Sequence, residues 1–397
     1  MGSALSTFSD FVASTGPSYL TSADMLINEV QKNSYIMRRF LKGADKTFVL
    51  QGGANIKDTL ILDENSTFQQ YQPNDVFTWS NPQVTSTLTI DWRFSVDHMS
   101  YTDQEIELNS GGGLSNEALR GVYKRLKREK EMRMWTSMIN GWEDLLWRLP
   151  RKSEMEDSTG LYPYSIPALL NEKSNGLFDY SGDAFTTVHG INPSTKTRWK
   201  PQTQTFAGGT DYINAATPRT NIMGAFDQMF YKVKFEAPPT KQEYFENPKL
   251  NSQFIACSRK ALNAYQQLLR SSQDRFTGIA NYQDPAYLTP QYGGIDLQYV
   301  AALDTAALYG GAGTTYYAED DTAASTAAGP RYYWINGQYL CPVFHSSRYM
   351  VSKAPMTHPN QPFTTVVVTD CWWNLVVRSR QRHGIVSPAS GVDCTNY

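Results

Sequence analysis

The 397-residue sequence lacks the segments that direct a chain to a membrane or out of the cell. No stretch approaches the roughly 18 consecutive apolar residues that a membrane-spanning helix needs. The N-terminal segment MGSALSTFSDFVAS has neither the basic start nor the long apolar core of a secretory signal. We therefore expect a chain that is neither secreted nor inserted in a membrane.

Cysteine is also scarce, and no pair of cysteines has the CxxC spacing of a redox or zinc motif. The four residues, Cys257, Cys341, Cys371 and Cys394, are far apart in the sequence. This usage indicates reduced, mostly buried thiols in a cytosolic setting and argues against a disulfide framework.

Charge is the third feature in short supply. Charged residues make up 19% of the chain, against about 25% in a typical protein, and the net charge is −2. Any contact with nucleic acid must therefore come from a local basic patch. Aromatic residues are plentiful at 13%, a bias typical of surfaces that contact other proteins.

Catalytic signatures are missing as well. Gly111–Gly113 precede a helical segment, but no Lys-Ser/Thr pair follows them, so we expect a hinge and not a phosphate-binding loop. Cys341 and His345 alone have a spacing suited to a metal. Glu319–Asp321 could hold a cation, although a solvated acidic turn is the expectation. A metal-dependent hydrolase would require these residues to converge on one site.

Alternating side chains dominate residues 46–109. Apolar and polar residues alternate over thirteen positions, with one face made of Val84, Leu88, Ile90, Trp92, Phe94 and Val96. This period of two predicts a strand. Shorter strands are expected at 59–62 and 76–79, separated by Pro- and Asn-containing turns, so the region is interpreted as a long antiparallel β-hairpin.

A long helix is predicted from about residue 114 to 149, where Pro150 ends it. At 1.5 Å per residue it would span about 50 Å. Leu119, Val122 and Leu126 form the apolar face of its first half, whereas Trp135, Trp142 and their neighbours lie nearly opposite. The buried face therefore switches midway, as expected for a helix that packs on different partners at its two ends.

The rest of the chain predicts a mixed architecture. Residues 22–41 are a short helical candidate, and 150–250 show little periodicity, so loops and short strands are expected there. A strand at 254–257 is followed by Ser258 as N-cap of a helix. Further strands are expected at 294–303, 331–343 and 363–377. The fold class is α+β.

This order of elements resembles the subunit shared by tailed-phage capsids and encapsulins, the HK97-like capsid fold. Four stretches are similar to the phage proteins in particular: GLFDYSGDAFTTVHGINPSTKTRWKP (176–201), FIACSRKALNAYQQLL (254–269), RYYWINGQYL (331–340) and CWWNLVVRSRQRHGIV (371–386). The resemblance implies five regions: an N-terminal arm (1–45), an extended β-hairpin loop (46–110), a peripheral domain with a spine helix at 114–149 (111–215), an axial domain (216–360), and a return strand with the C-terminal tail (361–397).

The same resemblance implies a major capsid protein that is not an enzyme and needs no cofactor. It would form pentamers and hexamers of an icosahedral shell around double-stranded DNA, in the virion, after assembly in the host cytoplasm. No protease-like segment or coiled-coil leader precedes the arm, so a separate scaffolding protein is expected, along with a portal and possible cement proteins. The alternatives are an encapsulin-like nanocompartment shell and, further off, the metal-dependent hydrolase.

Two groups of residues are candidate contact sites. The spine helix carries a basic patch made of Arg120, Lys124, Arg125, Lys127 and Arg128. It is either a solvated face with salt bridges or a surface for sequence-independent phosphate contacts with packaged DNA. The second group, expected to contact neighbouring subunits, is Trp79, Trp92, Arg378, Arg380 and Arg382. The basic run RSRQRH could equally be the gatekeeper of an edge strand.

Overall fold

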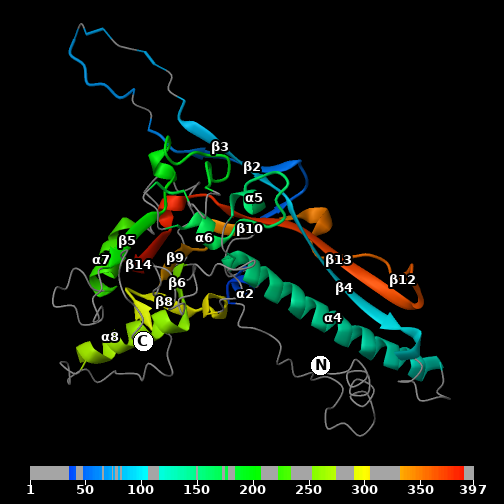
Figure 1. Ribbon diagram of the computed structural model, residues 1–397. Coiled ribbons are helices and arrows are strands. Elements are labelled where there is room, and N and C mark those ends of the chain that lie inside the picture. Colours follow the sequence, from blue (N-terminus) through cyan, green and yellow to red (C-terminus); the bar gives the residue numbers. More distant parts are fainter. Residues whose placement is uncertain are drawn as a thin grey trace. The chain divides into compact units, whose positions relative to one another are not determined.

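The structure is a computed structural model. It describes residues 35–41, 48–64, 67–73, 75–76, 79–80, 83–105, 116–148, 151–171, 175–177, 184–206, 222–233, 253–273, 290–304 and 331–388. The chain divides into two compact units, each assembled from separate segments. One contains residues 94–142 and 347–372, and the other contains 33–93, 143–346 and 373–397. The predicted α+β class is confirmed, because each unit combines helices with a sheet (Figure 1).

A six-stranded sheet forms the centre of the larger unit. Its order is β5-β14-β9-β6-β8-β7, with bounds Gln202–Phe206, Gly384–Pro388, Tyr332–Asn336, Gln253–Cys257, Ile295–Tyr299 and Gln291–Tyr292. β14 is parallel to β5, and β6 is parallel to β8, while β9 runs antiparallel to both β14 and β6. Every residue of β6, β9 and β14 is buried, as expected for strands covered on both faces.

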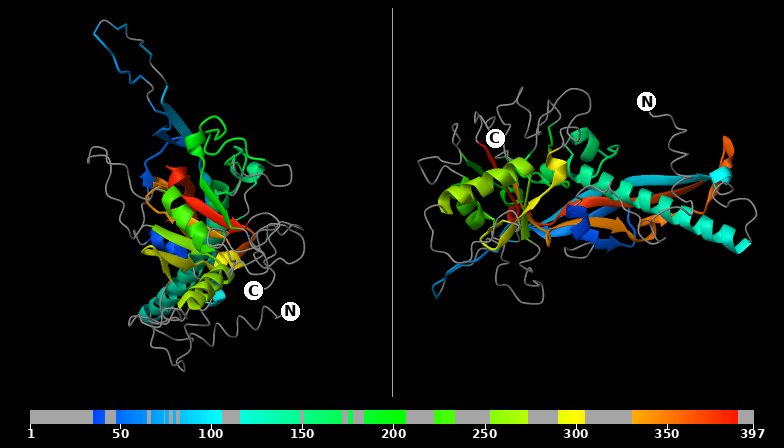
Figure 2. Two further views of the ribbon diagram at one scale, coloured as in Figure 1. Left: turned by 90° about the vertical axis from the view of Figure 1, so that its left-hand side faces the viewer. Right: turned by 90° about the horizontal axis from the view of Figure 1, so that it is seen from below.

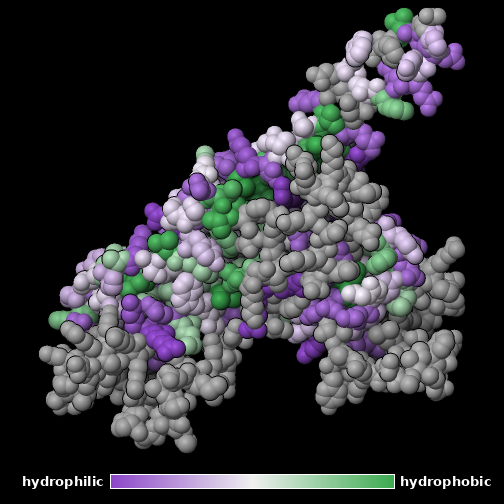
Figure 3. Space-filling model, turned by 180° about the vertical axis from the view of Figure 1, so that it is seen from behind, coloured by the Kyte–Doolittle hydropathy of each residue, from purple (hydrophilic) through white to green (hydrophobic). Residues whose placement is uncertain are grey.

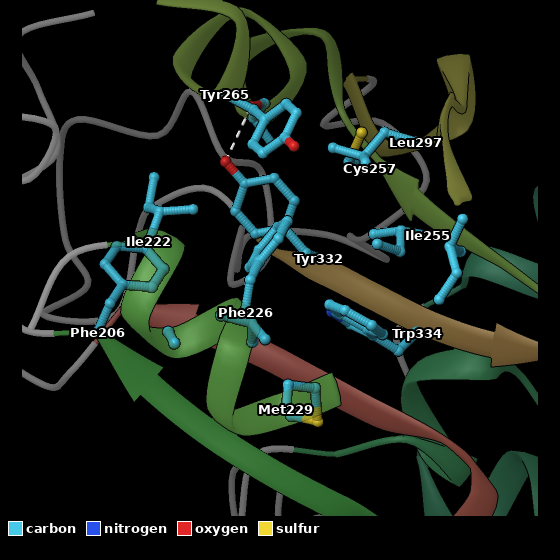
Figure 4. Packing of buried hydrophobic residues seen from close by; sticks show 14 of the residues in the cluster. Phe206, Ile222, Phe226, Met229, Ile255, Cys257, Tyr265, Leu297, Tyr332 and Trp334 are labelled. Atoms are coloured by element: carbon cyan, nitrogen blue, oxygen red, sulfur yellow. Dashed lines mark hydrogen bonds between the residues drawn. The ribbon is translucent and has the colours of Figure 1, made fainter. Parts of the chain in front are cut away.

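Two helices, α7 (Ile222–Lys232) and α8 (Arg259–Gln273), pack against this sheet. α8 begins as predicted, because the Ser258 hydroxyl accepts a hydrogen bond from the Ala261 amide at 3.1 Å. Phe226 of α7 lies at the centre of an aromatic cluster with Tyr265, Tyr332 and Trp334 (Figure 4). The Tyr332 hydroxyl is satisfied by the Ala261 carbonyl at 2.9 Å, so the cluster buries no unpaired phenol at this position.

Strand β14 was not predicted, and a glycine explains how it is accommodated. A Cβ at Gly384 would lie 2.4 Å from the sulfur of Met229 and 3.0 Å from a methyl group of Val233, so glycine lets α7 approach this strand without displacing the Met229 side chain. Helix α7 was also missed, although Ile222, Ala225, Phe226 and Met229 are buried at helical spacing. The described residues of the region 150–250 therefore contain more regular structure than the composition indicates.

A second group of strands in the larger unit consists of β1 (Phe48–Leu50), β10 (Leu340–His345) and the end of β13 (Gln361–Val377). The expected strand at 331–343 is in fact two strands, β9 and β10, which are joined by a turn at 337–339. They do not pair with each other, because β9 joins the six-stranded central sheet and β10 pairs with β13. The turn thus passes the chain from one sheet to another.

The predicted hairpin is present and belongs to the larger unit. β2 (Asn55–Ile61) pairs with β3 (Thr85–Asp91) in antiparallel register from Asn55 opposite Asp91 to Ile61 opposite Thr85. The expected strand at 76–79 is not found at its described residues, which have no regular structure at 75–76 and 79–80. Both views of Figure 2 show the hairpin (blue) extending beyond its paired strands.

The single strand expected over 84–96 is interrupted at Trp92. Trp92 and Arg93 are both buried, so the alternation inverts between β3 and β4 (Arg93–Thr102). Phe94 and Val96, expected on the buried face, are therefore exposed, and Met99 is buried instead. A one-residue irregularity moves every later side chain to the other face of the strand.

The smaller unit contains most of β4, the first part of β13, and the short strands β11 (Val351–Ser352) and β12 (Met356–His358), which pair with β13. The strand predicted at 363–377 is thereby confirmed as β13. The apolar cluster of the smaller unit contains Met99 and Tyr101 of β4, Val367 of β13 and Met134 of a long helix.

That helix, α4 (Asn116–Trp147), confirms the predicted spine helix. In its second half Met138, Trp142 and Leu146 are buried, as the apolar pattern predicts. The side chains of residues 116–126, which form the other predicted face, lie outside the described residues. None of the helices within the described ranges is long and apolar enough to cross a membrane.

A short helix, α2 (Tyr35–Leu41), packs in the larger unit with Ile36, Met37 and Phe40 buried. The Glu143 carboxylate accepts hydrogen bonds from the Ile36 and Met37 amides at 3.4 and 2.8 Å. Burial raises the pKa of Glu143 to about 7 despite these bonds. The remaining short helices are α5 (Lys152–Met155), α6 (Ile166–Leu169) and the 3₁₀ turns η1 (Thr197–Trp199), η3 (Ala301–Asp304), η5 (Ser346–Arg348) and η6 (Arg380–Arg382).

Candidate functional site

The end of the hairpin exposes apolar side chains that a folded chain normally buries. Phe68 is 85% exposed, Val76 is 94% exposed and Trp79 is 90% exposed. Figure 3 shows this end as a projection on which hydrophobic residues lie among hydrophilic ones. Large apolar groups gathered in this way mark a surface for contact with another molecule. We refer to residues 66–82 as the tip and to β2 with β3 as the stem.

The stem, in contrast to the tip, is anchored by burial. Ile56, Leu60, Leu88 and Ile90 alternate with exposed residues and are at most 8% exposed. Each buried aliphatic side chain of this size stabilises the folded state by about 1.5–3 kcal/mol. One face of the stem is therefore a part of the subunit core, and the hairpin cannot detach as a free arm.

A backbone hydrogen bond connects β3 to a neighbouring loop. The Thr89 amide donates to the His189 carbonyl at 3.0 Å. His189 and Gly190 both have positive φ and form a tight turn between Val188 and Ile191, a conformation for which glycine is suited. The turn at 188–191 thus places the His189 carbonyl within hydrogen-bonding distance of β3.

The base of the stem is connected to β13 by one amide side chain. Asn374 Nδ2 donates to the Asp91 carbonyl at 2.7 Å, and Asn374 Oδ1 accepts from the Tyr164 amide at 3.0 Å. The fully buried Asn374 therefore satisfies both of its polar ends by joining three segments that are distant in sequence.

Three ion pairs connect β2 and the residues after it to the body. Arg378 Nε lies 2.7 Å from Asp58 Oδ2. Lys196 pairs with Asp63, and Arg198 pairs with Glu64. The acidic partners all belong to the hairpin and the basic partners all belong to the body, so the contact is electrostatically complementary.

The basic run after β13 contains a wholly buried arginine. Arg380 donates three hydrogen bonds of 2.9 Å, to the carbonyls of Leu169, Gly176 and Trp199. Burial lowers the pKa of Arg380 to about 9. Burial and the nearby Arg380 charge lower the pKa of His189 to about 3, so this imidazole is neutral at physiological pH.

Arg93 makes a similar set of contacts at the start of β4. Its guanidinium donates to the carbonyls of Met155, Asp157 and Gly160 at 2.6–2.9 Å and to that of Ser158 at 3.4 Å. Arg93 and Arg380 thus each satisfy several backbone carbonyls of the loops that surround them. These loops, within 151–200, supply the residues that contact the stem.

The structure separates the residues expected at subunit contacts. Trp79 is exposed at the tip, in agreement with an outward role. Trp92 is buried, and its indole donates to the Gly53 carbonyl at 2.9 Å, so its side chain is not available to a neighbour. The same correction applies to Arg380, which is neither a subunit contact nor a gatekeeper. Arg378 pairs with Asp58, and Arg382 lies 4.8 Å from the Tyr339 ring centre; their contact with neighbours stays a prediction.

Only part of the predicted basic patch is described. The side chains of Arg120, Lys124 and Arg125 lie outside the described residues. Lys127 is 3.6 Å from Glu131 in an i,i+4 ion pair, and Arg128 is exposed. The ion pair is the arrangement expected of a solvated helix face, while contact with DNA stays a prediction.

The residues considered for a metal do not form a site within the described part of the chain. Cys341 is fully buried in β10, and the His345 ring packs edge-on against Trp92 at 5.3 Å. No group of three His, Cys, Asp or Glu side chains suited to a metal occurs among the described residues. The acidic triplet 319–321 lies outside them.

Three basic residues of this arrangement, Lys196, Arg198 and Arg380, acquire their roles from distant partners. Lys196 and Arg198 lie more than 130 residues from the acids that they contact. Their sequence, STKTRW, shows a polar turn and gives no sign of the pairing. The acidic residues Asp58, Asp63 and Glu64 lie at the two ends of the strand predicted at 59–62, but the sequence does not indicate their partners.

Comparison with known proteins supports the architecture. No family model matches the chain, and no curated protein matches it. Among solved structures, a chain of the cyanophage A-1(L) capsid asymmetric unit superposes with a TM-score of 0.52 at 13% identity, over 95% of this chain and 99% of that chain. A capsid chain of an empty GTA particle gives 0.51 at 9% identity, over 95% and 98%. The capsid of cyanophage P-SCSP1u gives 0.50 at 11% identity, over 94% of each chain.

These matches extend over nearly the whole length of both partners, so they concern the complete fold and not one shared motif. Because the identities are only 9–13%, the matches describe the fold and not the roles of individual residues. The chain has the HK97-like fold of phage capsid subunits.

Proposed function

We propose that this chain is the major capsid protein of a tailed bacterial virus. Many copies would form pentamers and hexamers of an icosahedral shell that encloses packaged double-stranded DNA. The observation that carries the proposal is the full-length likeness to capsid subunits, joined with an anchored hairpin whose tip exposes apolar side chains.

In this function the hairpin tip contacts a neighbouring copy of the chain. Closed shells need contacts that repeat from subunit to subunit, and an arm that leaves the body can provide them. Phe68, Val76 and Trp79 offer apolar area that a neighbour would remove from water. The chain acts structurally, and no catalytic step is assigned to it.

The remaining partners follow from the same proposal. A separate scaffolding protein would direct shell closure, a portal would occupy one vertex, and cement proteins are further candidate partners. Packaged DNA would meet the shell through sequence-independent phosphate contacts, for which Lys124, Arg125, Lys127 and Arg128 are candidates. The chain would reside in the virion capsid after assembly in the host cytoplasm.

Two other functions compete with this one. An encapsulin-like compartment shares the idea of a closed shell but encloses protein cargo. A metal-dependent hydrolase would need Cys341, His345 and the acidic triplet to converge; Cys341 is inaccessible in β10. Nucleic acid inside purified particles, or its absence with an enclosed protein, discriminates between the two shells.

Assembly itself is the decisive experiment. The purified chain, alone and with a coexpressed scaffolding protein, is examined by negative-stain electron microscopy and light scattering. We expect capsomers and closed shells. A chain that stays monomeric under both conditions contradicts the proposal.

The hairpin is tested by deleting residues 66–82. Because the deletion lies beyond the buried stem, the variant should fold with an unchanged thermal transition and yet assemble poorly. Shells of normal yield from this variant would remove the tip from the assembly mechanism.

The spine helix is tested by replacing Lys124, Arg125, Lys127 and Arg128 with glutamine. Empty shells should form normally if these residues face DNA, while packaging declines. Loss of empty shells would instead assign the patch to contacts between subunits. Replacement of Lys353, an exposed residue outside the helix, serves as the matched charge control.

A further inference from the structure

The three ion pairs between the hairpin and the body are distributed along the hairpin and do not lie at a single point. Asp58 lies within β2, while Asp63 and Glu64 follow the end of the strand. Asp63 and Glu64 come five and six residues after Asp58, and because β2 ends at Ile61 and Asp63 lies in a bend, the separation is at most about 15–20 Å. Burial and hydrogen bonds already fix the stem, so the outer pairs, beyond the end of β2, are the contacts that can set the direction of the chain that leads into the tip.

We propose that Lys196 and Arg198 are positioning residues that fix the direction in which the hairpin leaves the body. Arg378 supplies the inner contact and these two residues supply the outer one. The hairpin tip is thereby presented to a second copy of this chain in one orientation. The identity of that partner rests on the proposed function; the fixed direction is a property of the single subunit.

The two basic residues are on a rigid base. Trp199 closes the η1 turn by donating from its amide to the Lys196 carbonyl at 2.8 Å, and its indole donates to the Val188 carbonyl at 3.0 Å. The Trp199 carbonyl in turn accepts from the buried Arg380 at 2.9 Å. Lys196 and Arg198 therefore lie just before a fully buried tryptophan. Their backbones cannot follow the hairpin if it moves.

The same segment also holds the inner part of the stem. His189, whose carbonyl accepts from the Thr89 amide, precedes Lys196 by seven residues. Thr89 lies opposite Lys57 in the register of the hairpin, next to Asp58. One loop thus contacts the hairpin at both ends of the interval that sets its direction.

The exposure of these pairs explains why their role is orientation and not stability. The side chains of Lys196 and Asp63 are 30% and 44% exposed, and those of Arg198 and Glu64 are 48% and 79% exposed. Pairs with this much solvent contribute little to the free energy of unfolding, and salt screens them. Breaking them should release the tip while the stem stays folded.

The experiment measures tip direction in the unassembled subunit. Spin labels are attached at Gln70→Cys in the tip and Tyr231→Cys on α7, both exposed, in a chain carrying Cys394→Ser. The described native cysteines are buried and are poor labelling sites. Double electron–electron resonance then reports the distribution of distances between the labels.

Four chains are compared by this measurement. We expect one narrow distribution for the labelled parent, and a distribution at least about twofold wider for Lys196→Glu with Arg198→Glu, because like charges then face Asp63 and Glu64. Adding Asp63→Lys and Glu64→Arg should restore the parent width by recreating the pairs with opposite polarity. Lys57→Glu is the matched control. Lys57 is an exposed charge on β2 that makes no ion pair among the described residues, so its reversal should leave the width of the distance distribution unchanged.

An unchanged width in the charge-reversed variant overturns the proposal, as does failure of the swapped variant to recover the parent width while its thermal transition matches the parent. Assembly of the unlabelled versions is followed in parallel by light scattering, where the reversed variant should lose at least about tenfold in rate and the swapped variant should regain it. A parent chain that never assembles would refute the proposed function and leave the distance result to stand by itself.

Discussion

The aromatic cluster of the central sheet and the tip of the hairpin use the same kinds of side chain in opposite environments. Phe226, Tyr332 and Trp334 are completely buried, whereas Phe68 and Trp79 are almost completely exposed. The cluster holds the subunit together, because removing its residues from water stabilises the fold. Phe68 and Trp79 at the tip keep most of their surface in water, so they add little to the apolar burial that holds the subunit together and are available for contact with another molecule.

This difference implies that folding and assembly can be disturbed separately. Substitutions in the body should lower the free energy of unfolding, and substitutions in the tip should not. The four predictions that follow test that separation, beginning with the largest change in stability.

Phe226→Ala should cost about 3–5 kcal/mol in the free energy of unfolding, because it leaves a cavity among four surrounding rings. Urea denaturation of the unassembled subunit measures it. Phe68→Ala is the matched control at the tip and should change the value by less than about 0.5 kcal/mol. Equal losses from the two variants would abolish the distinction between core and tip.

Arg380→Met should cost about 3 kcal/mol, because three buried carbonyls lose their donor. Arg382→Met, in the same 3₁₀ turn, removes a partly exposed cation from the Tyr339 ring and should cost at most about 1 kcal/mol. Thermal unfolding of both variants gives the comparison. A larger loss from Arg382 would show that buried contacts do not dominate this turn.

Glu143 should make the subunit less stable as pH rises. Its pKa is about 7 in the folded chain against 4.5 for the ordinary group, so the folded state binds more protons between these values. The free energy of unfolding then falls with increasing pH by up to about 1.4 kcal/mol per unit. Denaturation curves from pH 5 to 8 should show this slope in the parent and its loss in Glu143→Gln.

The buried histidines are the internal reference for that measurement. His189 and His383, both with a pKa of about 3, act in the opposite direction, since the unfolded chain protonates first. They are present in both chains, so the difference between parent and variant isolates Glu143. Parallel pH curves for the two chains would contradict the assignment.

The smallest effect on stability is expected at the tip. Phe68→Ser combined with Trp79→Ser should leave the thermal transition within about 1 °C of the parent value, because neither side chain is buried. Assembly followed by light scattering should nevertheless slow by at least about tenfold. Stability loss comparable to that of Arg380→Met would mean that the tip is part of the subunit core.

Much of the fold was predictable because its signals are local. The spine helix, the strand at 253–257, the Ser258 cap and the long β13 all follow from spacing over a few residues. α7 carried a helical pattern at 222, 225, 226 and 229 that its loop-like surroundings obscured. The inversion at Trp92 was not predictable, because the alternation of the sequence continues without a break through Phe94 and Val96, which the structure exposes.

The candidate site was harder to predict from the sequence, because its contacts join residues that are far apart in the chain. Trp79 was identified by its type, and its exposure agrees. Arg380 reads as one member of an exposed basic run, and only the carbonyls of Leu169, Gly176 and Trp199 turn it into an interior residue. Long-range satisfaction of polar groups is invisible to local patterns.

The position of β14 in the central sheet has a consequence for biosynthesis. This strand lies between β5 and β9, and its partner β5 precedes it by 182 residues. The sheet is therefore incomplete until residue 388 has been synthesised, and such distant pairing is slow to form. The hairpin, encoded near the beginning, emerges long before the body that orients it. During that interval the apolar side chains of the tip are exposed beside an incomplete sheet, a condition that favours association between incompletely folded chains.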